Sequence, residues 1–304
     1  MFRQTTPRSG LRLSVALLSL AFTALAGASL AQSPTPTPTP ASEVMLGGYR
    51  VTSSTEIGWR WRSVDGNVNK YRSDLNYKQG FRTFDTNLLL EKESGSGNWF
   101  DSLLVSNSGW GSDPSGYTRV NIEKVGAYKA NFNVRRIKYF NNLLNHALNE
   151  HNQDTVHNLG DFDLTLRPQD ERLRIKIGGS YGGNSGSGSY TTRAYSDEFP
   201  VAAFIRTRTV DWHVGVEGKA FGGFDYGLTQ GFRIFKDFTS YRADGPNPGN
   251  NTTNTAALAT FFRAFPTEGH AYFTQGYLHR TFDKKLDFYG SPYLFQYEFE
   301  HGSK

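Results

Sequence analysis

Cysteine is absent from the 304 residues of this chain. Disulfide frameworks and thiolate zinc sites are therefore excluded, and stability has to come from packing and backbone hydrogen bonds. Long apolar runs are equally scarce, because no window after residue 31 holds the roughly eighteen apolar residues that a membrane-spanning helix needs. Hydrophobic residues make up 37% of the chain and its mean hydropathy is negative, which excludes a helical membrane protein.

Aromatic residues and glycine are abundant instead. The chain contains 23 Phe, 16 Tyr, 5 Trp and 32 Gly. Disordered chains are poor in aromatic residues, so this composition favours aromatic-rich β-structure. Charge is nearly balanced: without Arg3, Arg8 and Arg12, which lie in a segment that we expect to be cleaved, the 33 basic residues fall to 30 against 28 acidic residues. A nucleic-acid partner is therefore not expected.

The first 31 residues carry the features of a signal peptide. Three arginines precede an apolar run from residue 13 to residue 28, and Ser29-Leu30-Ala31 places small residues where a signal peptidase reads. A retained membrane anchor is the alternative, and the shortness of the run disfavours it. We therefore predict a cleaved signal peptide over residues 1–31. Residues 32–48, with alternating Thr and Pro up to Pro40, are predicted to form an extended, disordered spacer.

Period-two alternation begins at residue 49. In residues 49–62, Val51, Ile57 and Trp59 share one face while Arg50 and Arg60 share the other, as a strand with one wet and one dry side requires. The connections are too short for parallel crossovers, which predicts up-and-down antiparallel strands. The predicted strands are residues 49–62, 71–78, 84–91, 101–107, 118–123, 128–135, 162–166, 173–177, 201–208, 211–217, 224–235, 271–282 and 286–299.

Three longer insertions, residues 141–158, 178–189 and 236–268, interrupt this pattern. The first and third are predicted to hold one short helix each, and all three are interpreted as surface loops or, alternatively, as a pore constriction or docking surface. With this strand count, the first two insertions fall at the end of the sheet where the first strand begins. That placement indicates either a miscounted strand or loops that meet a periplasmic partner.

The orientation of the apolar face decides the fold. The strands run for about ten residues, aromatic residues gather near strand ends, and charges occupy the opposite face, all of which is typical of a membrane barrel with a polar lumen. We therefore predict an all-β protein: a transmembrane antiparallel up-and-down β-barrel of about 12 strands, with a range of 10–14, over residues 49–304. A soluble exported β-protein, with the same residues turned into a dry core, is the alternative.

The signal peptide, the Thr/Pro spacer and amphipathic hairpins such as Ala127–Val134 resemble those of Gram-negative outer-membrane β-barrel proteins, over Tyr49–Phe299. This resemblance implies an outer-membrane location, contact with outer-membrane lipid and insertion by the barrel-assembly machinery. Segments Tyr71–Leu75 and Val134–Phe140 are similar to porin-like barrels that sheathe multihaem cytochromes. The narrower resemblance implies a multihaem cytochrome as a periplasmic partner, while the oligomeric state stays open.

The charged face predicts a porin-like channel for passive transport of small polar solutes or ions, or a barrel scaffold, without a catalytic group or a cofactor. Alternatively, the same charges form salt bridges with one another and fill a narrow barrel. The candidate lumen-lining residues are Arg60, Arg72, Asp74, Asp85, Glu91, Arg119, Glu123, Lys129, Arg135, Arg174 and Lys176.

An enzymatic alternative rests on two short motifs. Asp161 and Asp163 share one strand face, as do Asp211 and His213, and together they could activate a water molecule. The two pairs are similar to the aspartate pair and the aspartate–histidine pair of omptin proteases, in the same chain order. Such spacing also arises by chance in alternating strands, so we do not expect an enzyme. The histidines of residues 146–157 lack metal-ligand spacing, and the glycine-rich stretch 178–188 lacks the Gly-Lys-Ser/Thr ending of a phosphate loop.

Overall fold

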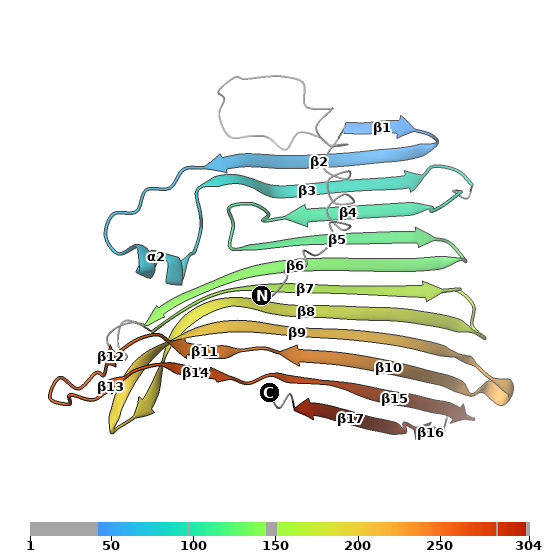
Figure 1. Cartoon of the computed structure of the whole chain (residues 1–304). Coiled ribbons are helices and arrows are strands. Elements are labelled where there is room, and N and C mark those ends of the chain that lie inside the picture. Colours follow the sequence, from blue (N-terminus) through green and yellow to red (C-terminus); the bar gives the residue numbers. More distant parts are fainter. Residues whose placement is uncertain (1–41, 96–97, 144–150, 284, 302–304) are drawn as a thin grey trace, which may run out of the picture. The chain divides into compact units, whose positions relative to one another are not determined.

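A computed structural model describes residues 42–95, 98–143, 151–283 and 285–301. The predicted signal peptide and the Thr/Pro repeat lie outside these residues. The first strand begins at Ser42, ahead of the predicted start at Tyr49. The predicted all-β, antiparallel, up-and-down fold is confirmed, because consecutive hairpins lie side by side in one large sheet (Figure 1). Among the described residues, no helix is long and apolar enough to span a membrane.

The sheet follows chain order from β1 to β10 and continues through β15 to β16, and β17 also pairs with β15. Within the described residues the sheet is open: β17 pairs with neither β1 nor β2, so a closed barrel is not observed. The bounds are β1 (Ser42–Leu46), β2 (Tyr49–Arg60), β3 (Gly80–Lys92), β4 (Ser102–Ser108), β5 (Ser115–Lys124), β6 (Tyr128–Leu143), β7 (His151–Leu166), β8 (Arg174–Ala194), β9 (Asp197–Lys219), β10 (Asp225–Asp237), β15 (Thr267–Phe282), β16 (Leu286–Gly290) and β17 (Tyr293–His301).

The predicted strand 71–78 is wrong. Its first half belongs to helix α2 (Val68–Asp74), which is capped by Asn67: the Asn67 side chain accepts hydrogen bonds from the backbone N–H groups of residues 69 and 70. Lys70 and Asp74, one helical turn apart, form an ion pair at 2.7 Å. The cap and the ion pair are local interactions that outweigh the alternating pattern of this short segment.

The glycine-rich residues 178–189, predicted as an interruption, lie inside β8. A Cβ on Gly178 would lie 2.4 Å from the His213 ring, so the glycine leaves room for a side chain from the neighbouring strand. The predicted strands 201–208 and 211–217 are two parts of the single strand β9. The β8 error arises because glycine carries no side chain to show alternation, whereas β9 was divided because its apolar residues change from odd positions, as at Val201 and Ala203, to even positions, as at Trp212 and Val214.

Of the two predicted helices, the first falls largely outside the described residues and the second is wrong. Residues 144–150 lie outside the described residues, and the remainder of the first insertion continues β6 and begins β7. Residues 236–268 are fully described and contain only short strands, which are β11 (Ser240–Ala243), β12 (Asn247–Pro248), β13 (Ala257–Leu258) and β14 (Phe261–Ala264), together with the ends of β10 and β15. Phe199, Val201, Ala243 and Leu258 form a small buried core where β11–β14 meet β9.

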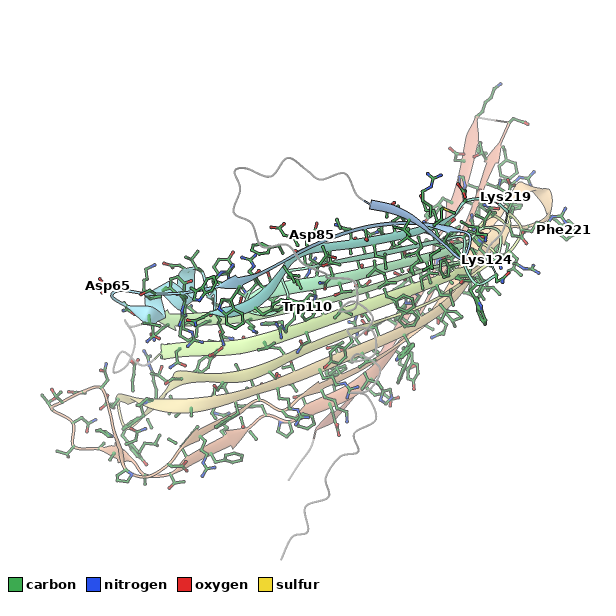
Figure 2. The ribbon with its side chains drawn as sticks, turned by 90° about the horizontal axis from the view of Figure 1, so that it is seen from above. Asp65, Asp85, Trp110, Lys124, Lys219 and Phe221 are labelled. Carbon is green, nitrogen blue, oxygen red and sulfur yellow. The ribbon has the colours of Figure 1, made fainter. Side chains whose placement is uncertain are left out.

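Short and long connections lie at opposite ends of the strands. The hairpins β5–β6, β7–β8 and β9–β10 turn at one end, where Figure 2 shows Lys124, Lys219 and Phe221. The connection that contains α2 and the excursion β11–β14 lie at the other end, with Asp65. The first insertion was expected at the end of the sheet where the first strand begins, and this placement is wrong. The segment that is α2 was counted as a strand, and one extra strand moves every later connection to the opposite end of the sheet.

Candidate functional site

The pairing register divides the sheet into two chemically different faces. Directly paired residues of antiparallel strands share a face, and successive residues alternate between faces. One such row is mainly polar and crosses β2–β10, β15 and β17: Arg50, Glu91, Ser102, Glu123, Lys129, Thr165, Lys176, Gly215, Thr229, Gln275 and Tyr293. The adjacent row on the other face is mainly apolar: Val51, Leu90, Leu103, Ile122, Ala130, Leu164, Ile177, Val214, Gln230, Thr274 and Leu294.

The face that contains the second row, which we call the apolar face, is extensively exposed. Relative exposure is 49% at Val134, 52% at Trp212 and 68% at Leu294. Helix α2 reaches this face near the paired ends of β6 and β7, where Arg72 lies over the ring of Phe140 and beside Asp154. Water-soluble monomers rarely expose a contiguous apolar surface of more than a few hundred Å². The apolar face therefore requires a covering that the described residues do not supply.

Nine of the eleven candidate lumen residues lie on the opposite face, which we call the polar face. Arg72 and Asp74 do not, because both belong to α2, where Arg72 pairs with Asp154 at 2.6 Å. Arg60 lies on the polar face but is held at the sheet end by Asp113, at 2.6 Å. The residues on the polar face are Arg60, Asp85, Glu91, Arg119, Glu123, Lys129, Arg135, Arg174 and Lys176.

Part of the polar face is a network of ion pairs. Glu217 accepts from Arg174 at 3.0 Å and from Lys176 at 2.7 Å. Arg233 binds both carboxylate oxygens of Asp211, at 2.6 and 2.9 Å. The Arg233 guanidinium and the Asp211 carboxylate form the planar bidentate geometry that gives the strongest ion pairs. Strands β8–β10 thus carry charges that compensate one another, as the alternative of a salt-bridge ladder requires.

Strands β5–β7 carry a different arrangement. A cavity of about 440 Å³ opens here, and Arg119, Arg135 and Asp161 are among its lining residues. Asp161 accepts from Asn133 at 2.6 Å, and Arg119 donates to Asn121 at 3.2 Å. Two guanidinium groups and one carboxylate therefore line this polar space, which gives it an excess of positive charge.

The four residues of the enzymatic alternative lie on the polar face of β7 and β9, with β8 between them. His213 Nε2 lies 3.8 Å from Asp163 Oδ1, which is longer than a hydrogen bond. Asp211 is bound by Arg233 and by the Ser180 hydroxyl, so it does not orient the imidazole of His213. The carboxylates are close to His213, but none of them holds its imidazole in the orientation that a general base needs.

Sequence reasoning missed an aromatic stripe on the polar face. Tyr293, Phe295, Tyr297 and Phe299 follow one another along β17, with ring centroids 6.3, 5.7 and 4.9 Å apart. Glu298, between the last two, points to the opposite face and pairs with His270 at 3.1 Å. The alternation of aromatic and polar residues along this strand was visible in the sequence, but only the pairing register shows that the aromatic side shares a face with the charges of β8 and β10.

Among the described residues, no cluster of three or more His, Asp or Glu side chains could hold a metal ion. No protein-family model, curated protein or solved structure matches the chain.

Proposed function

We propose that this chain forms a transmembrane β-barrel in a Gram-negative outer membrane and acts as a porin-like channel for small polar solutes or ions. In this proposal the apolar face contacts lipid acyl chains and the polar face lines the lumen. The observation that carries the proposal is the segregation of the two faces, because adjacent rows of paired residues differ in polarity across most of the sheet. A polar lumen and an apolar exterior are the arrangement of outer-membrane barrels.

The extent of the apolar face supports this orientation. On β6 the residues of this face are apolar from Tyr128 to Val134, and the next residue on the face is Arg136. On β9 they are apolar from Val216 to Val210, and the next is Arg208. Arg136 and Arg208 lie in the same row of paired residues, so the apolar band ends at one level on both strands. A lysine or arginine at the bilayer midplane costs about 2–4 kcal/mol, which accounts for the lack of Lys and Arg within this band on β6 and β9. Glu298 lies on the same face in the row of Val134 and Val210, where it pairs with His270.

Closure of the sheet is the second element of the proposal. The outer edge of β17 and the part of β2 beyond β1 have no ladder partner among the described residues. Backbone groups in a bilayer must find hydrogen-bond partners, and closure supplies them. The short connections at one end and the long ones at the other also match the periplasmic turns and extracellular loops of such barrels.

Planar-bilayer recordings test the channel. We expect stable conductance steps from the purified, detergent-folded chain, and a preference for anions arising from Arg119 and Arg135. A soluble exported β-protein would instead stay in the aqueous fraction without detergent, would show no change of gel mobility on boiling, and would give no conductance. Absorbance of haem in the chain isolated from its native membrane would favour the cytochrome-sheathing barrel over a simple channel.

A further inference from the structure

A row of cations borders the apolar face at the end with the long connections. Arg136 on β6, Arg208 on β9 and Lys236 on β10 belong to one row of paired residues. Lys138 and Arg206 lie on the same face, two residues farther along β6 and β9. We call these five residues the basic row. On each strand the basic row follows directly after the apolar band.

Carboxylates neutralise little of this charge. Lys236 pairs with Glu268 at 2.7 Å. Within the described ranges, Arg136, Lys138, Arg206 and Arg208 form no ion pair, in contrast to Arg174, Lys176 and Arg233 on the polar face.

Aromatic rings accompany two of these guanidinium groups instead. Arg136 lies over Trp110 at 5.1 Å and Arg208 over Tyr181 at 5.7 Å. The Nε of Arg136 is buried without a hydrogen-bond partner. Hydrogen-bond capacity and positive charge are thus both left over at this level of the sheet.

We propose that the basic row binds the phosphate groups of anionic lipids in the leaflet next to the long connections. The inference rests on the proposed membrane barrel and adds the class of lipid that its outer surface selects. A phosphate ester with acyl chains fits both parts of the surface at once, because the chains cover the apolar face while the phosphate meets the guanidinium groups. Arginine binds phosphate in a planar, bidentate fashion, and aromatic rings are enriched at the same membrane interface. A free anion would use the cations but leave the adjoining apolar face uncovered.

The test uses the full chain folded in a non-ionic detergent. Phosphatidic acid, whose headgroup is a phosphate monoester, and phosphatidylcholine with the same acyl chains are added separately, and native mass spectrometry counts the lipids retained. The test variant is Arg206→Gln with Arg208→Gln. The matched control is Thr207→Gln with Thr209→Gln, which changes the polar face of the same strand. Arg206→Lys with Arg208→Lys tests whether positive charge restores binding.

We expect the natural chain to retain phosphatidic acid in preference to phosphatidylcholine, and the double Gln variant to bind it roughly 30-fold more weakly, from about 1 kcal/mol per cation. The threonine control should bind as the natural chain does, and the Lys variant should retain most of the affinity. Equal binding of both lipids, unchanged binding by the double Gln variant, or full displacement by inorganic phosphate would overturn the lipid site and leave the barrel intact. A chain whose gel mobility never responds to boiling would overturn the barrel and, with it, the basic row.

Discussion

The carboxylate of Asp113 binds Arg60 at 2.6 Å, and Arg82 approaches its other oxygen at 2.8 Å. Asp113 lies in the connection between β4 and β5, so this contact ties that connection to β2 and β3. The Asp113 side chain is 7% exposed and each arginine side chain 19% exposed. Removal of one member of a buried ion pair is costly because the remaining charge loses its partner.

Substitution Asp113→Ala should therefore lower the free energy of unfolding by about 3 kcal/mol, measured by urea titration of the detergent-folded chain. Asp74→Ala is the matched control, because its ion pair with Lys70 is exposed and should contribute about 0.3–0.5 kcal/mol. Equal effects of the two substitutions would contradict the role of Asp113 as the anchor of this sheet end.

Glu217 sets the balance of charge on the polar face of β8 and β9. Substitution Glu217→Gln leaves Arg174 and Lys176 without their carboxylate. The substitution removes one negative charge from the polar face. If this face lines a lumen, the ratio of anion to cation permeability should rise roughly twofold to threefold, because one unit charge at a few ångströms in water changes the energy of a passing ion by somewhat less than 1 kcal/mol. The reversal potential in a salt gradient measures this ratio.

Glu298→Gln is the control for selectivity, because Glu298 lies on the opposite face and pairs with His270. It should leave the reversal potential unchanged. A shift of the same size in both variants would mean that the polar face of β8 and β9 does not line the conduction path.

Asp170 gives a pH-dependent contribution to stability in the β7–β8 turn. Its Oδ1 accepts the backbone N–H groups of Arg172 and Leu173, and these hydrogen bonds hold the pKa of the carboxyl below its usual value. Because the folded pKa is depressed, the stabilisation is present above the unfolded pKa of about 3.9 and is lost as pH falls through the folded value.

The stability difference between the natural chain and Asp170→Ala should accordingly be constant near neutral pH and shrink as the pH falls below about 4. Urea titrations at a series of pH values measure it. A difference that grows as the solution is acidified would show that the turn hydrogen bonds do not favour the ionised carboxylate.

The sequence predicted strands well wherever both faces carry side chains. Alternation identified β5 and β6 with the turn at Val125-Gly126, and it assigned Arg119, Lys129 and Arg135 to one face, as the register confirms. The alternating pattern gave a wrong strand at α2, where the Asn67 cap and the ion pair between Lys70 and Asp74 favour a helix. It gave no strand for the glycine-rich part of β8, because glycine has no side chain and rings from β7 and β9 occupy the space beside Gly178 and Gly179.

Contacts between distant parts of the chain explain what sequence reasoning missed in the site. Nothing in the segments themselves indicates that Arg136 and Arg208 share a row, or that Arg233 binds Asp211, because both relationships depend on the register of several successive strands. The aromatic stripe of β17 was readable as a pattern, but the face on which it lies is set by pairing with β15.

The orientation of the two faces can be tested directly, because the chain has no cysteine and any introduced cysteine is unique. Spin labels are placed singly at four positions of β9, of which Thr209 and His213 lie on the polar face and Val210 and Trp212 on the apolar face. In vesicles, labels at Val210 and Trp212 should collide preferentially with oxygen, which concentrates in the acyl region. Labels at Thr209 and His213 should collide preferentially with a water-soluble nickel chelate. A dry protein core would protect Val210 and Trp212 from both reagents, and that outcome would remove the lipid-facing surface on which the channel and the basic row both depend.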